Sequence, residues 1–216
     1  MLWIVGLEKT NLVTNGRSLY GWCCPLGLSF EVDLVLDERI LSSIAMTTPN
    51  EESMNDPCEI PITLSSRPGV PSSTIFTKQY VLEKLGDRNT IILLPGGPGN
   101  DMGMYDDPDI SIAQTFFQVA DVILFDPRSC VKSESCDMAL CSLEHYIDDV
   151  EAIRHHFNIK PGQFFVFGQS YGSIVALGYA IRYNNSLRKL LLIGAVASSD
   201  FYDEAREKLK EIGTPE

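Results

Sequence analysis

The chain has 216 residues, 44% of them hydrophobic and 21% charged, which is ordinary for a globular protein with one sizeable core. Its formal net charge is −12 and the sequence has no basic patch, so nucleic acid is not an expected partner. No apolar stretch is long enough to span a membrane. The apolar start, Met1 to Leu7, lacks the basic leader and cleavage site of a signal peptide, so we expect a cytoplasmic protein in which this segment packs as a strand.

The predicted elements divide the chain into three regions. Residues 1–56 are weakly patterned, residues 57–200 form a core, and residues 201–216 have the pattern of an amphipathic helix that begins a cap. Six core strands are predicted: Glu59–Leu64, Thr74–Glu83, Thr90–Leu94, Val119–Phe125, Gln163–Phe167 and Leu187–Ala195. Helical stretches follow the third, fourth and fifth strands, and the first of them begins near Pro108. This alternation predicts an α/β fold with a doubly wound, mostly parallel sheet.

A glycine-rich loop, Pro95-Gly96-Gly97-Pro98-Gly99, follows the third predicted strand. That strand is an unbroken apolar run, which is typical of a parallel strand buried on both faces. Glycines let a backbone approach a substrate closely. Taken alone, this glycine loop could equally be a plain turn.

A second loop follows the fourth predicted strand and reads Asp126-Pro127-Arg128-Ser129-Cys130-Val131-Lys132-Ser133 (the Asp-Pro-Arg loop). A third motif, Gly168-Gln169-Ser170-Tyr171-Gly172, lies between an apolar strand and an apolar helical stretch. A G-x-S-x-G pentapeptide in this setting is typical of the nucleophile elbow of serine hydrolases. The turn strains the serine backbone, places its hydroxyl at the positive end of the helix, and requires small residues two before and two after the serine. Both of those residues are glycine here, although an ordinary strand-to-helix turn is the alternative.

With these three motifs in order, the chain resembles the serine-peptidase family of α/β-hydrolases that includes proline iminopeptidases and tripeptidyl aminopeptidases. The resemblance extends over roughly residues 58–199, and it implies the α/β-hydrolase fold and a peptide substrate. It implies Ser170 as the nucleophile and the N–H groups of Gly97 and Tyr171 as the oxyanion hole. It implies no metal and no organic cofactor. The family has glycines where this chain has Ser129 and Val131, so we expect a rearranged loop if those positions need a positive φ.

In this fold the triad acid and then the triad histidine follow the serine along the chain. No histidine follows Ser170, whereas the carboxylates that follow it include Asp200, Asp203 and Glu204. The three histidines all precede the serine, at or near the ends of a predicted helix: His145, His155 and His156. We therefore expect the sheet to be truncated after about its sixth strand and the triad acid and histidine to lie outside this chain. A second polypeptide that completes the fold is a candidate partner, and Leu187–Ala195 would be an exposed, association-prone edge.

Four aspartates follow the glycine loop: Asp101, Asp106, Asp107 and Asp109. An aminopeptidase binds a free α-ammonium group, and Asp101 and Asp106 are candidate carboxylates for that contact. The alternative is a solvated loop whose acidic residues favour the start of the next helix.

Six cysteines are present: Cys23, Cys24, Cys58, Cys130, Cys136 and Cys141. No C-x-x-C pair occurs, so a zinc site is not expected. Cys136 and Cys141 both lie in the loop after the fourth strand, as does Cys130, and could be bridged, but free thiols are the favoured interpretation.

Three hypotheses for the function remain open. The first is a serine aminopeptidase that forms an acyl-enzyme on Ser170. The second is a carboxylesterase-type acyl hydrolase on the same fold. The third is an inactive fragment, or a module that binds a partner through its open sheet edge.

Overall fold

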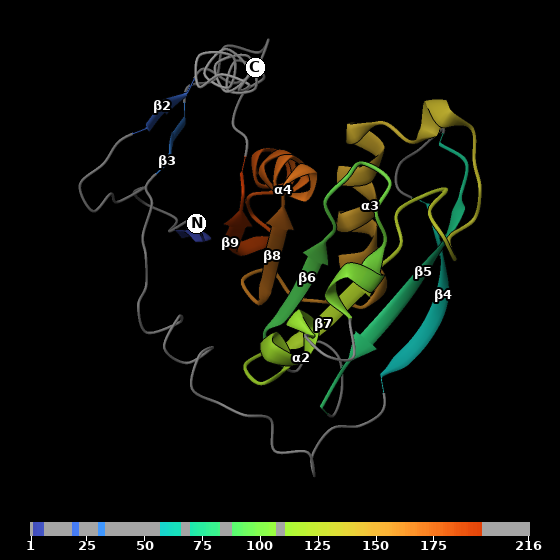
Figure 1. The fold of residues 1–216 in the computed structure, drawn as a ribbon, viewed down its shortest axis with the longest axis horizontal. Coiled ribbons are helices and arrows are strands. Elements are labelled where there is room, and N and C mark those ends of the chain that lie inside the picture. Colours follow the sequence, from blue (N-terminus) through green and yellow to red (C-terminus); the bar gives the residue numbers. More distant parts are fainter. Residues whose placement is uncertain are drawn as a thin grey trace, which may run out of the picture.

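A computed structural model describes residues 57–65, 70–82, 88–106 and 111–195, together with the backbone of residues 2–6, 19–21 and 30–32. Within these ranges seven strands form one sheet, in the order β1-β9-β8-β6-β7-β5-β4 (Figure 1). Their bounds are β1 Leu2–Gly6, β4 Cys58–Leu64, β5 Ser73–Tyr80, β6 Thr90–Leu94, β7 Asp121–Phe125, β8 Phe164–Gln169 and β9 Leu187–Ile193. Two short strands, β2 (Leu19–Gly21) and β3 (Phe30–Val32), pair with each other. The predicted helix within residues 201–216 lies outside the described residues.

The four central strands, β9, β8, β6 and β7, run parallel to one another, and β1, β4 and β5 join the sheet through antiparallel pairs. All six predicted core strands are present, each within a few residues of the predicted bounds. Every residue of β6 and of β7 is buried, including the polar first residues Thr90 and Asp121, as expected for central strands covered on both faces. The α/β fold and the parallel centre of the sheet are therefore confirmed.

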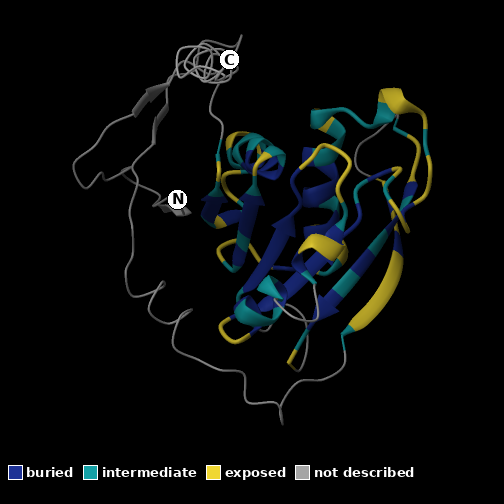
Figure 2. Cartoon of the chain, viewed as in Figure 1, coloured by how far each residue is buried: buried dark blue, intermediate teal, exposed yellow. Residues whose placement is uncertain are grey.

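Helices cover both faces of the sheet, and the strands between them are mostly buried (Figure 2). Successive side chains of each central strand belong alternately to two clusters, one on each face. Ile92 and Leu94 of β6 face a cluster that includes the helices α3 (Leu143–His156) and α4 (Tyr171–Arg182). Ile91 and Leu93 face a second cluster that includes α2 (Ile112–Phe117) and the 3-10 helix η2 (Met102–Tyr105). This is the doubly wound arrangement, because each crossover packs its helix on one face or the other.

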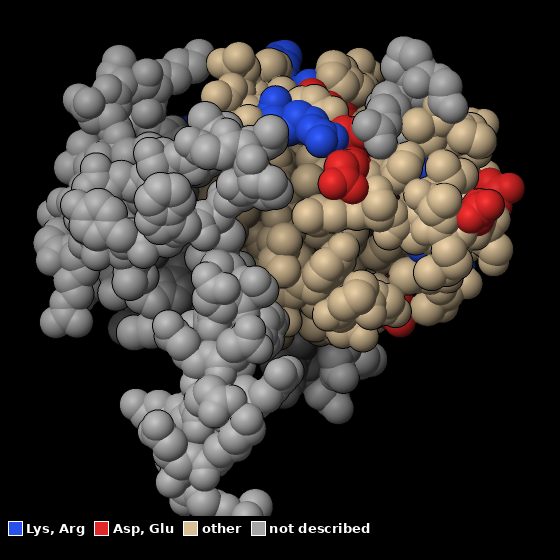
Figure 3. Space-filling view, turned by 90° about the horizontal axis from the view of Figure 1, so that it is seen from above, with Lys and Arg blue, Asp and Glu red and all other residues tan. Residues whose placement is uncertain are grey.

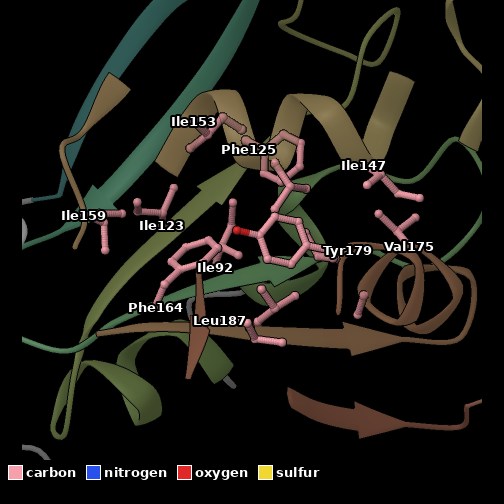
Figure 4. Packing of buried hydrophobic residues seen from close by; sticks show 14 of the residues in the cluster. Ile92, Ile123, Phe125, Ile147, Ile153, Ile159, Phe164, Val175, Tyr179 and Leu187 are labelled. Atoms are coloured by element: carbon pink, nitrogen blue, oxygen red, sulfur yellow. The ribbon is translucent and has the colours of Figure 1, made fainter. Parts of the chain in front are cut away.

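Aromatic and branched side chains fill the first cluster. In Figure 4 the ring of Tyr179, from α4, lies among side chains of the sheet, and Ile147 and Val175 lie beside it. Its ring centroid is 5.7 Å from that of Phe164, and its hydroxyl donates to Glu151 of α3 at 2.5 Å. The polar end of this buried residue is therefore satisfied by an acceptor on the neighbouring helix, as the low-polarity interior requires.

Serine residues determine where α2 and α3 begin. The hydroxyl oxygen of Ser111 accepts a hydrogen bond from the backbone N–H three residues later, and Ser142 does the same for α3. The helix that was predicted to begin near Pro108 therefore begins at Ile112, one residue after its cap. Pro108 itself lies outside the described residues.

Strand β1 covers the edge of β9. Residues 2–6 pair antiparallel with residues 193–189, so the backbone groups on that side of β9 have partners within the chain. The expectation that Leu187–Ala195 forms an exposed edge is therefore wrong, and the association predicted through it loses its structural basis. The prediction that Met1–Leu7 packs as a strand is confirmed. At the opposite end of the sheet, β4 pairs with β5 and exposes its residues 58–61.

Candidate active site

Ser170 occupies a strained turn between β8 and α4. Its φ is 52° and its ψ is −118°, a conformation that costs a non-glycine residue about 1–3 kcal/mol and that the surrounding structure must impose. Its N–H donates to the carbonyl of Ile193 at 3.0 Å, and its own carbonyl accepts from the N–H of Ser173 at 2.9 Å. The exposed side chain makes no cap hydrogen bond to the helix. The hydroxyl is therefore presented at the N-terminal, positive end of α4.

The two glycines of the elbow are required by close backbone contacts. A Cβ on Gly168 would lie 2.4 Å from the carbonyl oxygen of Gly172 and 2.8 Å from the Cα of Ser173. A Cβ on Gly172 would lie 2.2 Å from the carbonyl oxygen of Leu94. The start of α4 is thus packed directly on the end of β6, and no larger residue fits at either position without movement of the backbone.

The register of β6 and β8 brings the glycine loop beside Ser170. Leu94, the last residue of β6, is level with Gly168 of β8, so the loop that follows β6 begins next to the elbow. A Cβ on Gly96 would lie 3.4 Å from the carbonyl oxygen of Gln169 and 3.5 Å from the Cβ of Ser170. The glycine loop therefore contributes to the wall around the serine.

Gly97 and Tyr171 are placed by these same elements. Gly97 has φ 119°, and a Cβ there would lie 2.7 Å from the backbone nitrogen of Gly99. Tyr171 is the first residue of α4, and the first N–H groups of a helix have no acceptor within the helix. Tyr171 directly follows Ser170, and Gly97 directly follows Gly96, which lies against Ser170. Their role as oxyanion-hole donors remains a prediction.

Tyr105 of η2 braces the end of β6. Its hydroxyl donates to the carbonyl oxygen of Leu94 at 2.9 Å, the same oxygen that Gly172 approaches. The side chain is fully buried and its ring packs edge-on against Phe167 of β8, with centroids 5.7 Å apart. Burial raises the pKa of Tyr105, so the phenol keeps its proton and remains a donor. No local pattern in the sequence indicates this role.

The carboxylate of Asp126 connects the Asp-Pro-Arg loop with the segment after the glycine loop. It accepts from the backbone N–H of Met102 at 3.1 Å and from that of Lys132 at 3.0 Å. The hydroxyl of Ser133 donates to the backbone carbonyl of Asp126 at 2.6 Å and accepts from the N–H of Phe76 at 2.9 Å. The Asp-Pro-Arg loop and the segment after the glycine loop are therefore held as one unit.

A buried ion pair anchors the same loop to α3. The Nε and one terminal nitrogen of Arg128 each donate to a different carboxylate oxygen of Asp149, both at 2.6 Å, and the side chains are 3% and 2% exposed. These hydrogen bonds raise the pKa of Arg128, so it remains a cation. The paired geometry fixes both the distance and the orientation of the loop relative to the helix.

Ser129 and Val131 adopt positive φ angles of 60° and 33°. Both positions therefore keep a positive φ although neither is a glycine, and the expected rearrangement of the loop does not occur. Neighbouring hydrogen bonds hold the loop, from Ser129 N–H to the Glu134 carbonyl at 3.1 Å and from Cys130 N–H to the Pro127 carbonyl at 2.9 Å. Each left-handed residue costs about 1–2 kcal/mol, and the cost is greatest for a β-branched side chain such as that of Val131.

The candidate ammonium ligands have different surroundings. Asp101 caps η2, where its carboxylate accepts from the N–H of Gly103 at 2.6 Å. Asp106 is contacted by both the ammonium of Lys78 and the hydroxyl of Tyr80, and the Lys78 and Asp106 side chains are 16% and 18% exposed. Asp101 therefore retains acceptor capacity toward solvent, whereas the charge of Asp106 is already compensated. Asp107 and Asp109 lie outside the described residues.

The histidines all lie on α3, His145 in its first turn and His155 and His156 in its last, as predicted. Nδ1 of His145 is 3.0 Å from the hydroxyl oxygen of Ser142, and Nε2 of His155 is 3.1 Å from a carboxylate oxygen of Glu151. Within the described ranges no histidine forms a hydrogen bond with Ser170.

Figure 3 views the molecule from above, the side toward which the arrows of β6 and β8 point in Figure 1. The described part of this face is mostly uncharged; one group of acidic side chains lies next to basic ones, and another lies apart from them at the right edge of the view. Among the described residues, no three His, Cys, Asp or Glu side chains gather closely enough to hold a metal ion. None of the helices in those ranges combines the length and the apolarity that crossing a membrane requires.

The chain is similar to curated proteins that are named proline iminopeptidases. The protein of Elizabethkingia meningoseptica is 26% identical over 160 residues, which cover 73% of this chain and 50% of the relative. That of Flavobacterium johnsoniae is 28% identical over 122 residues, covering 55% and 39%. This chain therefore spans half or less of the length of these relatives.

Among solved structures, the proline iminopeptidase of Mycobacterium smegmatis matches with a TM-score of 0.52 at 17% identity, over 72% of this chain and 50% of that one. At this identity the likeness concerns the fold alone. The family model described as the alpha/beta hydrolase fold matches residues 89–212, which include the glycine loop, the Asp-Pro-Arg loop and the elbow. With more than half of its residues matched by that model, this chain belongs to the alpha/beta hydrolase fold family.

Proposed function

We propose that the chain carries the nucleophile and the oxyanion hole of a serine aminopeptidase, which removes residues from the amino terminus of peptides. The observation that carries this proposal is the exposed hydroxyl of Ser170, held on a strained turn beside the glycine loop. The curated relatives named proline iminopeptidases support a peptide rather than another acyl substrate.

In the proposed reaction, the hydroxyl oxygen of Ser170 attacks the carbonyl carbon of the first peptide bond and gives its proton to a general base. The carbonyl oxygen becomes an oxyanion, and the N–H groups of Gly97 and Tyr171 stabilise it. Collapse of the intermediate breaks the C–N bond, and the shortened peptide leaves as an amine after it receives the proton. Water then hydrolyses the acyl-enzyme and restores the serine.

The base and its orienting acid are proposed to come from outside this chain. The histidines of the chain make local contacts on α3, and no histidine follows Ser170 in the sequence. A serine hydroxyl without a positioned base is a weak nucleophile at neutral pH. A free imidazole in solution offers the same chemistry, and the exposure of Ser170 leaves room for it.

We assign the α-ammonium contact of the substrate to Asp101 rather than to Asp106. Asp106 is paired with Lys78, so a second cation would have to displace an existing one. Asp101 uses its carboxylate for one cap hydrogen bond and lies two residues after the last glycine of the glycine loop. A carboxylate can accept further hydrogen bonds from an ammonium group.

The test compares three substrates in the presence of imidazole: an aminoacyl nitroanilide with a free amino group, its N-acetylated form, and a simple nitrophenyl ester. We expect turnover of the free-amine substrate above that of the acetylated one, and loss of turnover in Ser170→Ala. Turnover of the ester alone would instead indicate a carboxylesterase. If Ser170→Ala hydrolysed all three substrates as fast as the unaltered chain, the proposal would be wrong.

Asp101→Asn is compared with Asp137→Asn, because Asp137 caps the 3-10 helix η3 (Met138–Leu140) in the same way, at 2.9 Å from the N–H of Ala139. We expect Asp101→Asn alone to raise KM for the free-amine substrate. An equal KM in both variants would leave Asp101 as a helix cap only.

A further inference from the structure

Two thiols lie in contact in the segment that joins β7 to α3. The Sγ atoms of Cys136 and Cys141 are 3.6 Å apart, and both residues are partly exposed. The hydroxyl oxygen of Ser129 lies 3.5 Å from the first sulfur and 3.7 Å from the second. The three side chains therefore form one compact group at the surface, within reach of small molecules in solution.

The backbone holds this group in place. The N–H of Cys136 donates to the hydroxyl oxygen of Ser129 at 2.9 Å, and the N–H of Ser129 donates to the carbonyl of Glu134 at 3.1 Å. The turn of η3 then brings the chain back, with the N–H of Cys141 donating to the carbonyl of Met138 at 3.0 Å. The proximity of the sulfurs thus follows from hydrogen bonds on both sides of the pair.

We propose that Cys136 and Cys141 are an oxidisable pair that forms a reversible disulfide with a small-molecule disulfide, such as oxidised glutathione, as the oxidant. The sulfurs must approach by about 1.5 Å to reach the bonding distance of about 2.05 Å, which side-chain rotation within an exposed loop can supply. All four cysteines of the described residues are free, so the reduced pair is the form the structure shows.

The exchange proceeds in two steps. One protein thiolate attacks a sulfur of oxidised glutathione, which forms a mixed disulfide and releases one glutathione thiolate. The second protein thiolate attacks the protein sulfur of the mixed disulfide, which forms the Cys136–Cys141 bond and releases the second glutathione. The protein loses two electrons and two protons, and the glutathione disulfide is reduced to two thiols.

The modification would change the segment that leads from the Asp-Pro-Arg loop to the N-cap of α3. Arg128 and Ser129 lie at one end of this segment, and Cys141 directly precedes Ser142, the cap residue. A covalent closure of the loop restricts the unfolded chain as well as the folded one. Disulfide formation needs no catalysis by Ser170, so it is independent of the proposed function.

Tryptic mapping tests the proposal, because cleavage after Lys132 and Arg154 leaves both cysteines in one peptide, residues 133–154. The full chain is incubated with oxidised glutathione, its remaining thiols are alkylated, and the masses of its tryptic peptides are measured by mass spectrometry. We expect this peptide to be two hydrogen atoms lighter than its reduced form and unalkylated, and to be alkylated at both positions after a reductant is added.

Single variants complete the test. Cys136→Ser and Cys141→Ser should each lose the internal bond, and the remaining cysteine should be alkylated or carry one glutathione. Cys58→Ser should form the bond like the unaltered chain, because Cys58 is exposed on strand β4, outside the segment that carries the pair. Complete alkylation of peptide 133–154 after oxidation, or a bond from Cys141 to Cys130 instead, would overturn the proposal.

Discussion

Replacing Gly172 with alanine should destabilise the whole domain, because the new methyl group meets backbone and not a side chain. Its Cβ would lie 2.2 Å from the carbonyl oxygen of Leu94, and 2.8 Å from both the carbonyl carbon of Leu94 and the carbonyl oxygen of Pro95. Ordinary contact begins at 3.4 Å, so α4 and β6 must separate by about 1.2 Å. The contact lies at the end of β6, which is buried at every position, so a shift of its backbone would disrupt the packing around it.

Overpacking of a dense core typically costs about 1–3 kcal/mol of folding stability. Because the new methyl group meets the backbone of Leu94 and Pro95, we expect Gly172→Ala to lie at the upper end of that range. For a chain of this size, about 3 kcal/mol lowers Tm by roughly 6–12 °C. Circular dichroism during a thermal scan measures this shift, provided that unfolding is reversible.

Gly178→Ala is the matched control, since Gly178 lies within the same helix. There the new Cβ would meet the terminal methyl of Ile147 at 2.3 Å, which a change of rotamer can move away. Alanine also favours a helix interior over glycine by about 1 kcal/mol, so Tm should change little. An unchanged Tm in Gly172→Ala, or an equal drop in both variants, would refute the packing of α4 on β6 described above.

Three further predictions concern the glycine loop, the Asp-Pro-Arg loop and the ion pair that anchors the latter to α3. Gly96→Ala should keep Tm, because its Cβ meets nothing closer than 3.4 Å, yet it should slow fluorophosphonate labelling of Ser170, which mass spectrometry measures. Val131→Gly should raise the free energy of unfolding by about 1 kcal/mol in urea titration, because it relieves a positive φ at an exposed side chain; no gain would contradict that strain. Asp149→Ala should lower the free energy of unfolding by about 3–5 kcal/mol, because it leaves the buried Arg128 charge without its carboxylate; a loss below 1 kcal/mol would contradict this role.

Local patterns were sufficient to predict the centre of the fold and the elbow. Strands such as β6 and β7 are short apolar runs buried at every position, and the glycines at 168 and 172 are needed by the backbone around them. The apolar strands and the contact of Gly168 with Gly172 depend on residues that are close in sequence, whereas the contact of Gly172 with Leu94 is long-range and is anticipated only because the elbow motif carries a glycine there.

Long-range pairings could not be predicted in this way. The pairing of β1 with β9 joins residues about 190 positions apart, and nothing in either strand's pattern specifies the other. The same holds for Asp106, whose partners Lys78 and Tyr80 lie on β5, and for Tyr105, whose acceptor is a backbone carbonyl. Ser129 and Val131 show a further limit, because tertiary hydrogen bonds hold a positive φ that their residue types disfavour.

The most direct test of the central claim is the rate at which a fluorophosphonate modifies Ser170, followed by intact mass with and without imidazole. In this reaction the serine oxygen attacks phosphorus and fluoride leaves, so a base accelerates it. A positioned general base accelerates such a reaction by about 10²–10⁴-fold. We expect free imidazole to raise the labelling rate by at least about tenfold. Labelling should be slow without imidazole, should increase with its concentration, and should be absent in Ser170→Ala. No adduct on Ser170 under either condition, or fast labelling that imidazole does not change, would contradict the account of an elbow that presents its serine and takes its base from outside the chain.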